Sequence, residues 1–376
     1  PARVTGDWDR SLSSYEFSPD GRTIYILAED EGHDRIFAVP AGGGTPRVVT
    51  DGSKGVYSGL SVGGRGRDAV LVATWESATN PPELVRIDPR NGRHDLLSAF
   101  STEAASRLDL QPLQEFWFDA SSGRRIHNFI ALPPNFDPNN RYPLLVLMHG
   151  GPHGAWKDQF VIRWNYHLHA RPGYVVLLTN FTGSTGFGES FAQAIQFDPL
   201  AGPAREINEA ADEAIRRYPF IDGSRQAAAG ASYGGHLAYW MQGTTDRYRT
   251  LIAHAGAMNM ESQWGTSDVV FHRERNFGGP VWERGPVWLE QNPILLAANF
   301  RTPMLITVGE RDYRVPLNTT LEAWTVLQRL QIPSRLIVFP DENHWVLDGE
   351  NSRFFYSEFH AWLARYLQPE QAAEGG

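Results

Sequence analysis

The sequence predicts a doubly wound, mostly parallel α/β sheet preceded by an incomplete β-propeller region. Two observations lead to this fold class. From about residue 113, short apolar runs typical of buried parallel strands alternate with stretches of helical periodicity. Before that point, short β-rich runs are separated by turn-forming residues. Alternation of strands and helices on this scale is typical of doubly wound α/β sheets.

The length of the chain, 376 residues, suits two domains at roughly 100–200 residues each. We predict a partial propeller over 1–112, an α/β catalytic domain over 113–368 and a flexible tail over 369–376, where the chain is small and polar. The chain opens on Pro1 and shows no signal-peptide pattern. We therefore expect that the native gene begins before this residue. Because a propeller needs at least four blades to close, either more blades precede Pro1 in the native gene or the region is a trimmed remnant.

Composition excludes several classes of function. The formal net charge is −9, from 34 Lys and Arg against 43 Asp and Glu, which argues against nucleic-acid binding. The absence of cysteine excludes disulfides, a thiolate nucleophile and thiolate-based zinc or iron–sulfur sites. No run of about 18 apolar residues occurs, so no membrane-spanning helix is expected. A protein without cysteine fits the cytoplasm or an exported location, and we favour export to the periplasm or the extracellular space.

The N-terminal region contains an internal repeat. Residues 15–27 form two β-rich runs around a Ser-Pro-Asp-Gly turn at 18–21. The pattern returns at offsets of about 43 and 48 residues, which fits one four-stranded propeller blade per repeat and hence about two blades. An antiparallel sandwich is the alternative. The corresponding segments are 60–64 with 17–21 and 87–97 with 39–49.

Buried strands and helices alternate in the second region, and groups that face a ligand are expected in the loops beyond the carboxyl ends of the strands. The expected strands are 144–150, 174–180, 227–232, 251–256, 304–310 and 335–340. The expected helices are about 204–218, 233–242, 318–330 and 352–367.

The strongest catalytic signal is the stretch G-A-S-Y-G at 230–234. It follows an apolar run and precedes a helical one, which is the setting in which G-x-S-x-G forms a nucleophile elbow. In that elbow a strained turn lifts the serine hydroxyl above the sheet edge, and the glycines leave room for neighbouring backbone. The pattern predicts an α/β-hydrolase with Ser232 as its nucleophile.

A serine hydroxyl needs a base and an orienting carboxylate. In α/β-hydrolases the acid and then the histidine follow the serine along the chain. Asp312 and His344 each lie in a loop directly after an expected strand, in that order. We therefore predict a Ser232–Asp312–His344 triad, with Glu310 as the alternative acid.

The other titratable residues receive different interpretations. His149 and His153 have the spacing of a metal pair, but Gly-Gly-Pro lies between them and no third ligand accompanies them, so no metal site is predicted. The remaining acids near the histidine loop are interpreted as solvated charges, and four further histidines as structural. These are Asp341, Glu342, His236, His254, His167 and His169.

Acyl transfer also needs an oxyanion hole, in which each donor is worth roughly 3–4 kcal/mol of barrier. The N–H of Tyr233, directly after the nucleophile, is one expected donor, and the N–H of Gly151 in the glycine-rich loop at 149–154 is the other. The glycine-rich segment 180–188 lacks the lysine of a phosphate loop and is interpreted as a wall of the active-site cleft.

Tryptophans are frequent after the elbow, and those at 264, 282 and 288 either line a substrate pocket or fill a core. We predict Trp264 and Trp345 as candidate substrate-binding residues.

Taken together, these segments resemble the prolyl oligopeptidase family of serine peptidases, in its acylaminoacyl peptidase and dipeptidyl peptidase V branch. The resemblance spans most of 140–350 in family order, and the FSPDG turn resembles the propeller of that family. The matching segments are HGGPHG, NFTGSTGFG, GASYGGH, FGGPVWE, RDYRVP and FPDENHWVL.

The resemblance implies the triad and oxyanion hole given above, no cofactor, and removal of dipeptides or acylated residues from the N-termini of short peptides. Thr182 stands where many relatives carry an arginine, which fits the dipeptidyl peptidase V side and removes an arginine role at this position. Two alternatives stay open. One is a carboxylesterase that uses the same triad on small acyl esters, and the other is an inactive binding protein on a hydrolase scaffold.

Overall fold

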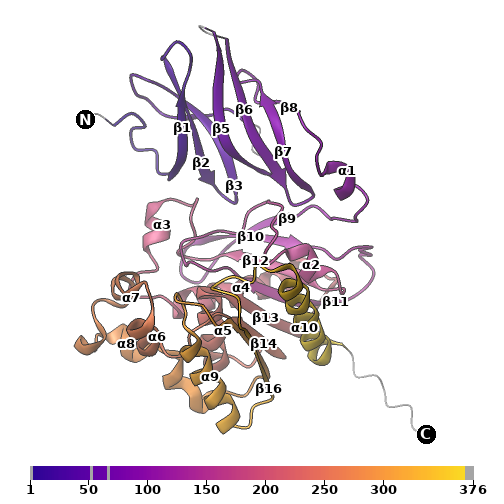
Figure 1. Cartoon of the computed structure of the whole chain (residues 1–376), viewed down its shortest axis with the longest axis vertical. Coiled ribbons are helices and arrows are strands. Elements are labelled where there is room, and N and C mark those ends of the chain that lie inside the picture. The colour runs from indigo at the N-terminus through magenta and orange to yellow at the C-terminus, as the bar shows by residue number, and fades with distance from the viewer. Residues whose placement is uncertain (1–2, 51–53, 66–67, 369–376) are drawn as a thin grey trace. The chain divides into compact units, whose positions relative to one another are not determined.

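A computed structural model describes residues 3–50, 54–65 and 68–368, and the predicted tail at 369–376 lies outside this part of the chain. The chain forms two compact units, which are described separately (Figure 1). The first unit holds the residues up to Gln114 together with Ala155–Asn165 and Ser184–Gln193, and the second holds the rest. The domain ranges proposed from the sequence treat each domain as one continuous stretch and stay a prediction.

The first unit is built on one sheet of two antiparallel meanders, β1–β4 and β5–β8, in which each strand pairs with the next. A single parallel pair, Asp34 with Val56, joins the meanders. The prediction of about two propeller blades over this region stays a prediction. The strands are β1 (Leu12–Phe17), β2 (Thr23–Asp30), β3 (His33–Pro40), β4 (Arg47–Val48), β5 (Val56–Arg65), β6 (Asp68–Ser77), β7 (Asn80–Ile87) and β8 (His94–Leu96).

One detail of the predicted repeat is wrong. Residues 60–64, which the repeat aligned with the turn at 17–21, lie inside strand β5. The pairing of β5 with β6 shifts register between Ser58 and Ser61, so β5 contains an irregularity that the aligned pattern did not include. The equivalence of 87–97 with 39–49 holds, because both segments run from the end of one strand through a turn into a short partner strand.

The segment Ala155–Asn165 is tied to the first unit by two neighbouring side chains. The Lys157 ammonium lies 2.6 Å from a carboxylate oxygen of Glu29 and 2.9 Å from one of Asp34. The Asp158 carboxylate accepts hydrogen bonds from the N–H groups of Gly55 and Ala78, at 2.7 and 2.8 Å. Charge pairing and backbone capping thus anchor this excursion of the chain.

The second unit contains a mostly parallel sheet in the order β16-β15-β14-β13-β11-β12-β10-β9. Strands β11 to β16 run parallel to one another, and β10 pairs antiparallel with β12. All six predicted strands are confirmed, whereas β9 and β10 were not predicted. The bounds are β9 (Gln114–Asp119), β10 (Arg125–Ala131), β11 (Tyr142–Met148), β12 (Val175–Asn180), β13 (Ile221–Ala231), β14 (Thr250–His254), β15 (Met304–Gly309) and β16 (Ser334–Phe339).

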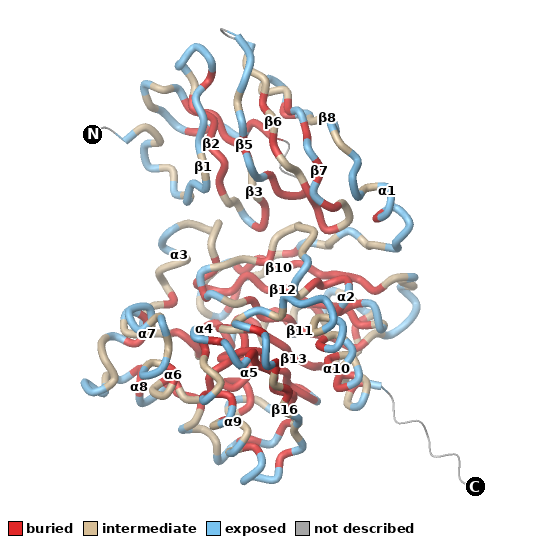
Figure 2. Tube along the Cα trace, in the orientation of Figure 1, coloured by how far each residue is buried: buried red, intermediate tan, exposed pale blue. Residues whose placement is uncertain are grey.

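Helices cover both faces of this sheet, as the doubly wound fold requires. Alternate residues of the strands, such as Leu144, Val146 and Met148 of β11, share one apolar cluster with α4, α5 and α9. Helix α10 packs on the opposite face, where the Trp362 indole donates to the Thr250 hydroxyl. The strands between these layers are buried almost throughout (Figure 2). The bounds are α4 (Ala201–Arg217), α5 (Tyr233–Thr244), α9 (Leu317–Arg329) and α10 (Gly349–Leu367), which confirm the four predicted helices.

A helical excursion separates β14 from β15 and forms a second small core. Trp288 is fully buried in this core, together with Phe277 and Val315. No helix in the described residues combines the length and the apolar character needed to cross a membrane. The elements of the excursion are α6 (Met260–Thr266), α7 (Val270–Phe277), η1 (Val281–Glu283), α8 (Pro286–Glu290) and η2 (Pro293–Asn299), and the remaining short helices of the chain are α1 (Thr102–Ala105), α2 (Tyr166–Ala170) and α3 (Glu189–Gln193).

Candidate active site

Ser232 occupies the sharp turn between β13 and α5. Its backbone has φ 57° and ψ −119°, a left-handed conformation that a residue with a Cβ rarely adopts. The N–H of Ser232 donates to the carbonyl of His254 on the neighbouring strand, at 2.9 Å, and so holds the turn against the sheet. The geometry is that of the nucleophile elbow that the motif predicted.

The glycines around Ser232 are required by close backbone contact. A Cβ on Gly230 would lie 2.4 Å from the carbonyl carbon of Gly234, and a Cβ on Gly234 would lie 2.1 Å from the carbonyl oxygen of Met148. Neither neighbour is a flexible side chain that could move aside. The spacing of the motif therefore reflects contact between the turn, its helix and the end of β11.

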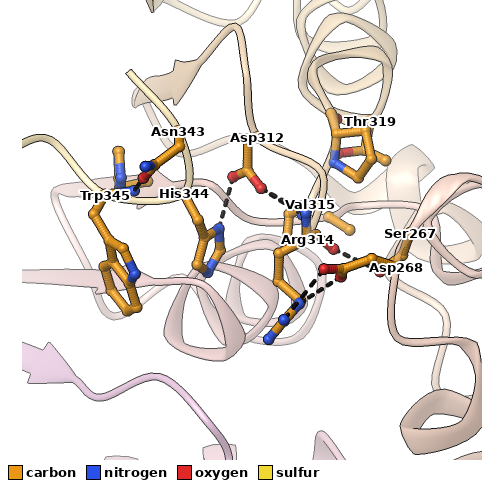
Figure 3. Close-up of polar contacts among 12 residues, drawn as sticks. Ser267, Asp268, Asp312, Arg314, Val315, Thr319, Asn343, His344 and Trp345 are labelled. Atoms are coloured by element: carbon orange, nitrogen blue, oxygen red, sulfur yellow. Dashed lines mark hydrogen bonds and ion pairs between the residues drawn. The ribbon is translucent and has the colours of Figure 1, made fainter.

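Asp312 and His344 are brought together from the loops after β15 and β16 (Figure 3). The His344 Nδ1 lies 2.7 Å from a carboxylate oxygen of Asp312. The other carboxylate oxygen accepts from the N–H groups of Arg314 and Val315, both at 2.8 Å. Asp312 is only 2% exposed, so its charge is compensated by these donors and by the imidazole rather than by water. Its orientation toward His344 is consequently fixed.

The loop that carries His344 rests on the end of β15. A Cβ on Gly309 would lie 2.1 Å from the carbonyl oxygen of Asn343 and 2.5 Å from that of Glu342. The Glu342 carboxylate closes the loop by accepting from the N–H groups of Leu347 and Asp348, at 3.0 and 2.9 Å. Glu342 was interpreted as a solvated loop charge; it is instead buried and holds the loop in shape.

We expect Gly309→Ala to lower kcat/KM by about 10²-fold or more, because the new methyl group displaces the loop and moves His344 by a fraction of an ångström or more. Steady-state kinetics on a hydrolysable acyl substrate measures the effect. Gly349→Ala is the matched control, since a Cβ there meets nothing within 4 Å, and it should keep wild-type kinetics. Equal activity of both variants would contradict this account of the loop.

A pocket of about 300 Å³ opens at the elbow. Its lining includes Ser232, Tyr233, Gly151, His344 and Trp345, so five of the predicted site residues face one space, with Asp312 behind the imidazole.

The other substrate-binding candidate, Trp264, is not among the residues that line the pocket. Its indole N–H donates to Glu274, and its ring packs edge-on against Trp282 at 5.5 Å.

Both residues expected to supply oxyanion donors line the same pocket as the serine. Tyr233 is the first residue of α5, so its N–H has no acceptor within the helix. The loop after β11 runs along the elbow, because β11 and β13 are adjacent parallel strands and a Cβ on Gly150 would lie 3.3 Å from the Ser232 Cβ. Gly151 has φ +126°, which only glycine adopts readily.

Several pocket residues were missed by the sequence reasoning. Arg273, Gln263, His272 and Asn276 come from α6 and α7, which carry no recognisable motif. His236 was interpreted as structural, yet it also lines the pocket. Its position four residues after Ser232, and so one helical turn along α5, was the signal that could have identified it.

Arg314 also lines the pocket, and its guanidinium binds the carboxylate of Asp268 at 2.6 Å (Figure 3). The hydrogen bond from Arg314 lowers the pKa of Asp268, so this pair stays ionised. Thr182 takes no part in the pocket lining; its N–H and hydroxyl both donate to the buried Glu206, at 2.8 Å.

The doubly wound sheet and the strained strand–serine–helix turn define an α/β-hydrolase. Within that class, residues 160–370 match the prolyl oligopeptidase family, and the chain belongs to this family.

Curated relatives and solved structures agree with this membership. The chain is 32% identical over 370 residues to dipeptidyl-peptidase 5 of Porphyromonas gingivalis, covering 97% of this chain and 53% of the relative. It is 33% identical over 379 residues to dipeptidyl-peptidase 5 of Aspergillus fumigatus, covering 98% and 52%. The chain thus spans about half the length of the curated relatives it matches.

Two solved structures show the same fold at lower identity. Acylaminoacyl peptidase from Pyrococcus horikoshii superposes with a TM-score of 0.85 at 22% identity, over 99% of this chain and 58% of that one. Dipeptidyl peptidase 4 of Porphyromonas gingivalis superposes with a TM-score of 0.80 at 21% identity, over 98% and 51%.

Proposed function

We propose that the protein is a serine peptidase that releases dipeptides from the N-termini of short peptides through an acyl-enzyme. The observation that carries the proposal is the hydrogen bond, 2.7 Å long, between Asp312 and His344, the histidine that lines the same pocket as the strained Ser232. The names of the curated relatives support the dipeptidyl specificity, and the family supports the peptidase chemistry. Short peptides are the proposed partners, and the native protein is proposed to be exported.

In the first half of the reaction, His344 acts as the base. Because Asp312 occupies Nδ1, the free nitrogen is Nε2, and it takes the proton from the Ser232 hydroxyl as the oxygen attacks the scissile carbonyl. The N–H groups of Tyr233 and Gly151 stabilise the resulting oxyanion. The imidazolium then protonates the leaving amine, the C–N bond breaks, and the acyl group stays on Ser232.

In the second half, water replaces the amine. His344 removes a proton from water as the water oxygen attacks the acyl carbonyl. The imidazolium then gives this proton to the Ser232 oxygen, the ester bond breaks, and the dipeptide leaves with a free carboxyl group. Asp312 keeps its charge throughout and stabilises the imidazolium. Every step uses side chains and backbone groups of this chain together with water.

The proposal predicts that an unblocked dipeptidyl p-nitroanilide is hydrolysed with a higher kcat/KM than an acetyl-amino-acid anilide or a p-nitrophenyl ester of the same P1 residue. The reason is that recognition of the first two residues contributes binding energy that the truncated substrates lack. Turnover of the ester alone would replace the peptidase assignment with an esterase one. Preference for the acetylated anilide would instead indicate an acylaminoacyl peptidase. Hydrolysis of none of the three substrates would favour a binding protein.

A further inference from the structure

The pocket at Ser232 contains one arginine whose charge no acid in the described part of the chain offsets. Among the described residues, its lining contains two arginines and four histidines but no aspartate or glutamate. Arg314 is paired with Asp268, as described above. Arg273 differs, because no carboxylate of the described chain lies within ion-pair distance of it.

The contacts of Arg273 are with neutral groups. Its Nε–H donates to the side-chain oxygen of Gln263 at 2.9 Å, and its guanidinium carbon lies 5.3 Å from the centre of the Phe277 ring. Gln263 is itself held, since its side-chain nitrogen donates to the carbonyl of Arg314 at 3.0 Å. The guanidinium is thus fixed in position. Burial lowers the pKa of Arg273 to about 10, which leaves it charged at neutral pH.

His236 presents a second donor at the same place. The N–H of Ala257 donates to Nδ1 of His236 at 2.8 Å, so Nδ1 carries no proton. Burial, and then the charges of Arg273 and His344, hold the pKa of His236 well below its usual range, so the ring is neutral. A neutral imidazole with a bare Nδ1 carries its proton on Nε2.

That Nε2 lies 3.1 Å from a terminal nitrogen of Arg273. Since both nitrogens bear hydrogen, neither can accept from the other. The two nitrogens therefore lie side by side in the pocket lining, and an oxygen acceptor in contact with both would accept a hydrogen bond from each. A carboxylate suits this arrangement, because it accepts only and because arginine binds it through two parallel hydrogen bonds.

The position of these donors identifies the part of the substrate that they meet. His236 lies one helical turn beyond Ser232 and Tyr233, and the same pocket contains the attacking hydroxyl and Gly151. The substrate group closest to the attacked carbonyl is the side chain of the residue that supplies this carbonyl, the P1 residue. Apolar side chains of Val269 and Val315 also line the pocket and can contact its methylenes.

We propose that Arg273 and His236 form a specificity site for an acidic P1 side chain, so that the enzyme prefers to cleave after Glu or Asp. This inference rests on the peptidase function proposed above and adds its substrate class. An apolar P1 side chain would cover the guanidinium without replacing its solvent hydrogen bonds, and it would therefore be disfavoured.

Dipeptidyl anilides that differ only at P1 test the proposal, in the series Glu, Gln, Leu and Lys. The wild-type enzyme should cleave the Glu substrate with a kcat/KM about 10- to 100-fold higher than the isosteric Gln substrate, as expected for a charge-assisted hydrogen bond. In Arg273→Gln this Glu-to-Gln ratio should fall to about one, and in Arg273→Glu the Lys substrate should overtake the Glu substrate.

Arg275→Gln is the matched control, because Arg275 lies on the same helix, is exposed and does not line the pocket. It should keep the wild-type Glu-to-Gln ratio. A ratio near one in the wild type, or a ratio that Arg273→Gln leaves unchanged, would overturn the specificity site while leaving the peptidase intact. Absence of cleavage of all four anilides by the wild type would overturn the proposed function itself. Active-site titration of each variant separates lost specificity from lost folding.

Discussion

Replacing Ser232 with alanine is expected to lower kcat on a dipeptidyl anilide by about 10⁶-fold, because the variant has no atom that can form the acyl-enzyme. The fold should persist. The contacts that hold the elbow are made by main-chain atoms, such as the Ser232 N–H to the His254 carbonyl at 2.9 Å, and alanine keeps them. Steady-state kinetics and labelling with a fluorophosphonate probe provide the two measurements.

The control for this variant is Ser224→Ala. Ser224 is an exposed residue near the start of β13, where its hydroxyl donates to Asp222 at 2.7 Å. This variant should label and turn over as the wild type does. Undiminished fluorophosphonate labelling of Ser232→Ala would show that another residue is the nucleophile.

Asp312→Asn is expected to lower kcat by about 10⁴-fold while the protein stays folded. One carboxylate oxygen of Asp312 accepts from two N–H groups, those of Arg314 and Val315. The amide oxygen of asparagine must take this place, which turns the NH₂ group toward His344. His344 Nδ1 then accepts instead of donating, its proton moves to Nε2, and the nitrogen that should deprotonate Ser232 is no longer a base.

Measurements of kcat across pH, with circular dichroism to verify folding, test this prediction. Glu310→Gln is the comparison, since Glu310 is exposed and lies two residues before Asp312. It should change kcat by less than about tenfold. A larger loss in Glu310→Gln than in Asp312→Asn would mean that the acid was assigned to the wrong residue.

The residues proposed to carry the chemistry could be predicted because each stands directly after a strand. Buried strands give apolar runs that are easy to recognise, and parallel strands bring their carboxyl ends to one edge, so Ser232, Asp312 and His344 could be expected to lie near each other. The antiparallel strands β9 and β10 escaped notice, since they precede the motifs. The register irregularity in β5 was also missed, because a bulge leaves no sequence signature of its own here. Residues 60–64 were therefore aligned with a turn although they lie within a strand.

The specificity site could not be predicted in the same way. Arg273 reaches the pocket only because α7 packs through Phe277 into the small core around Trp288, and that packing is tertiary. In the sequence, Arg273 stands among other charged residues of a short helix and looks solvated. The role of His236 depends on which of its nitrogens receives the Ala257 N–H, a contact made 21 positions along the chain.

The backbone of Ser232 has a consequence for how this position is selected. At φ 57° and ψ −119° a side chain costs about 1–3 kcal/mol that glycine would not, so selection for stability alone would remove it. A protein that used the scaffold only for binding would gain this stability by replacing the serine with glycine. With Ser232 as the proposed nucleophile, this is a single position at which stability and catalysis oppose each other.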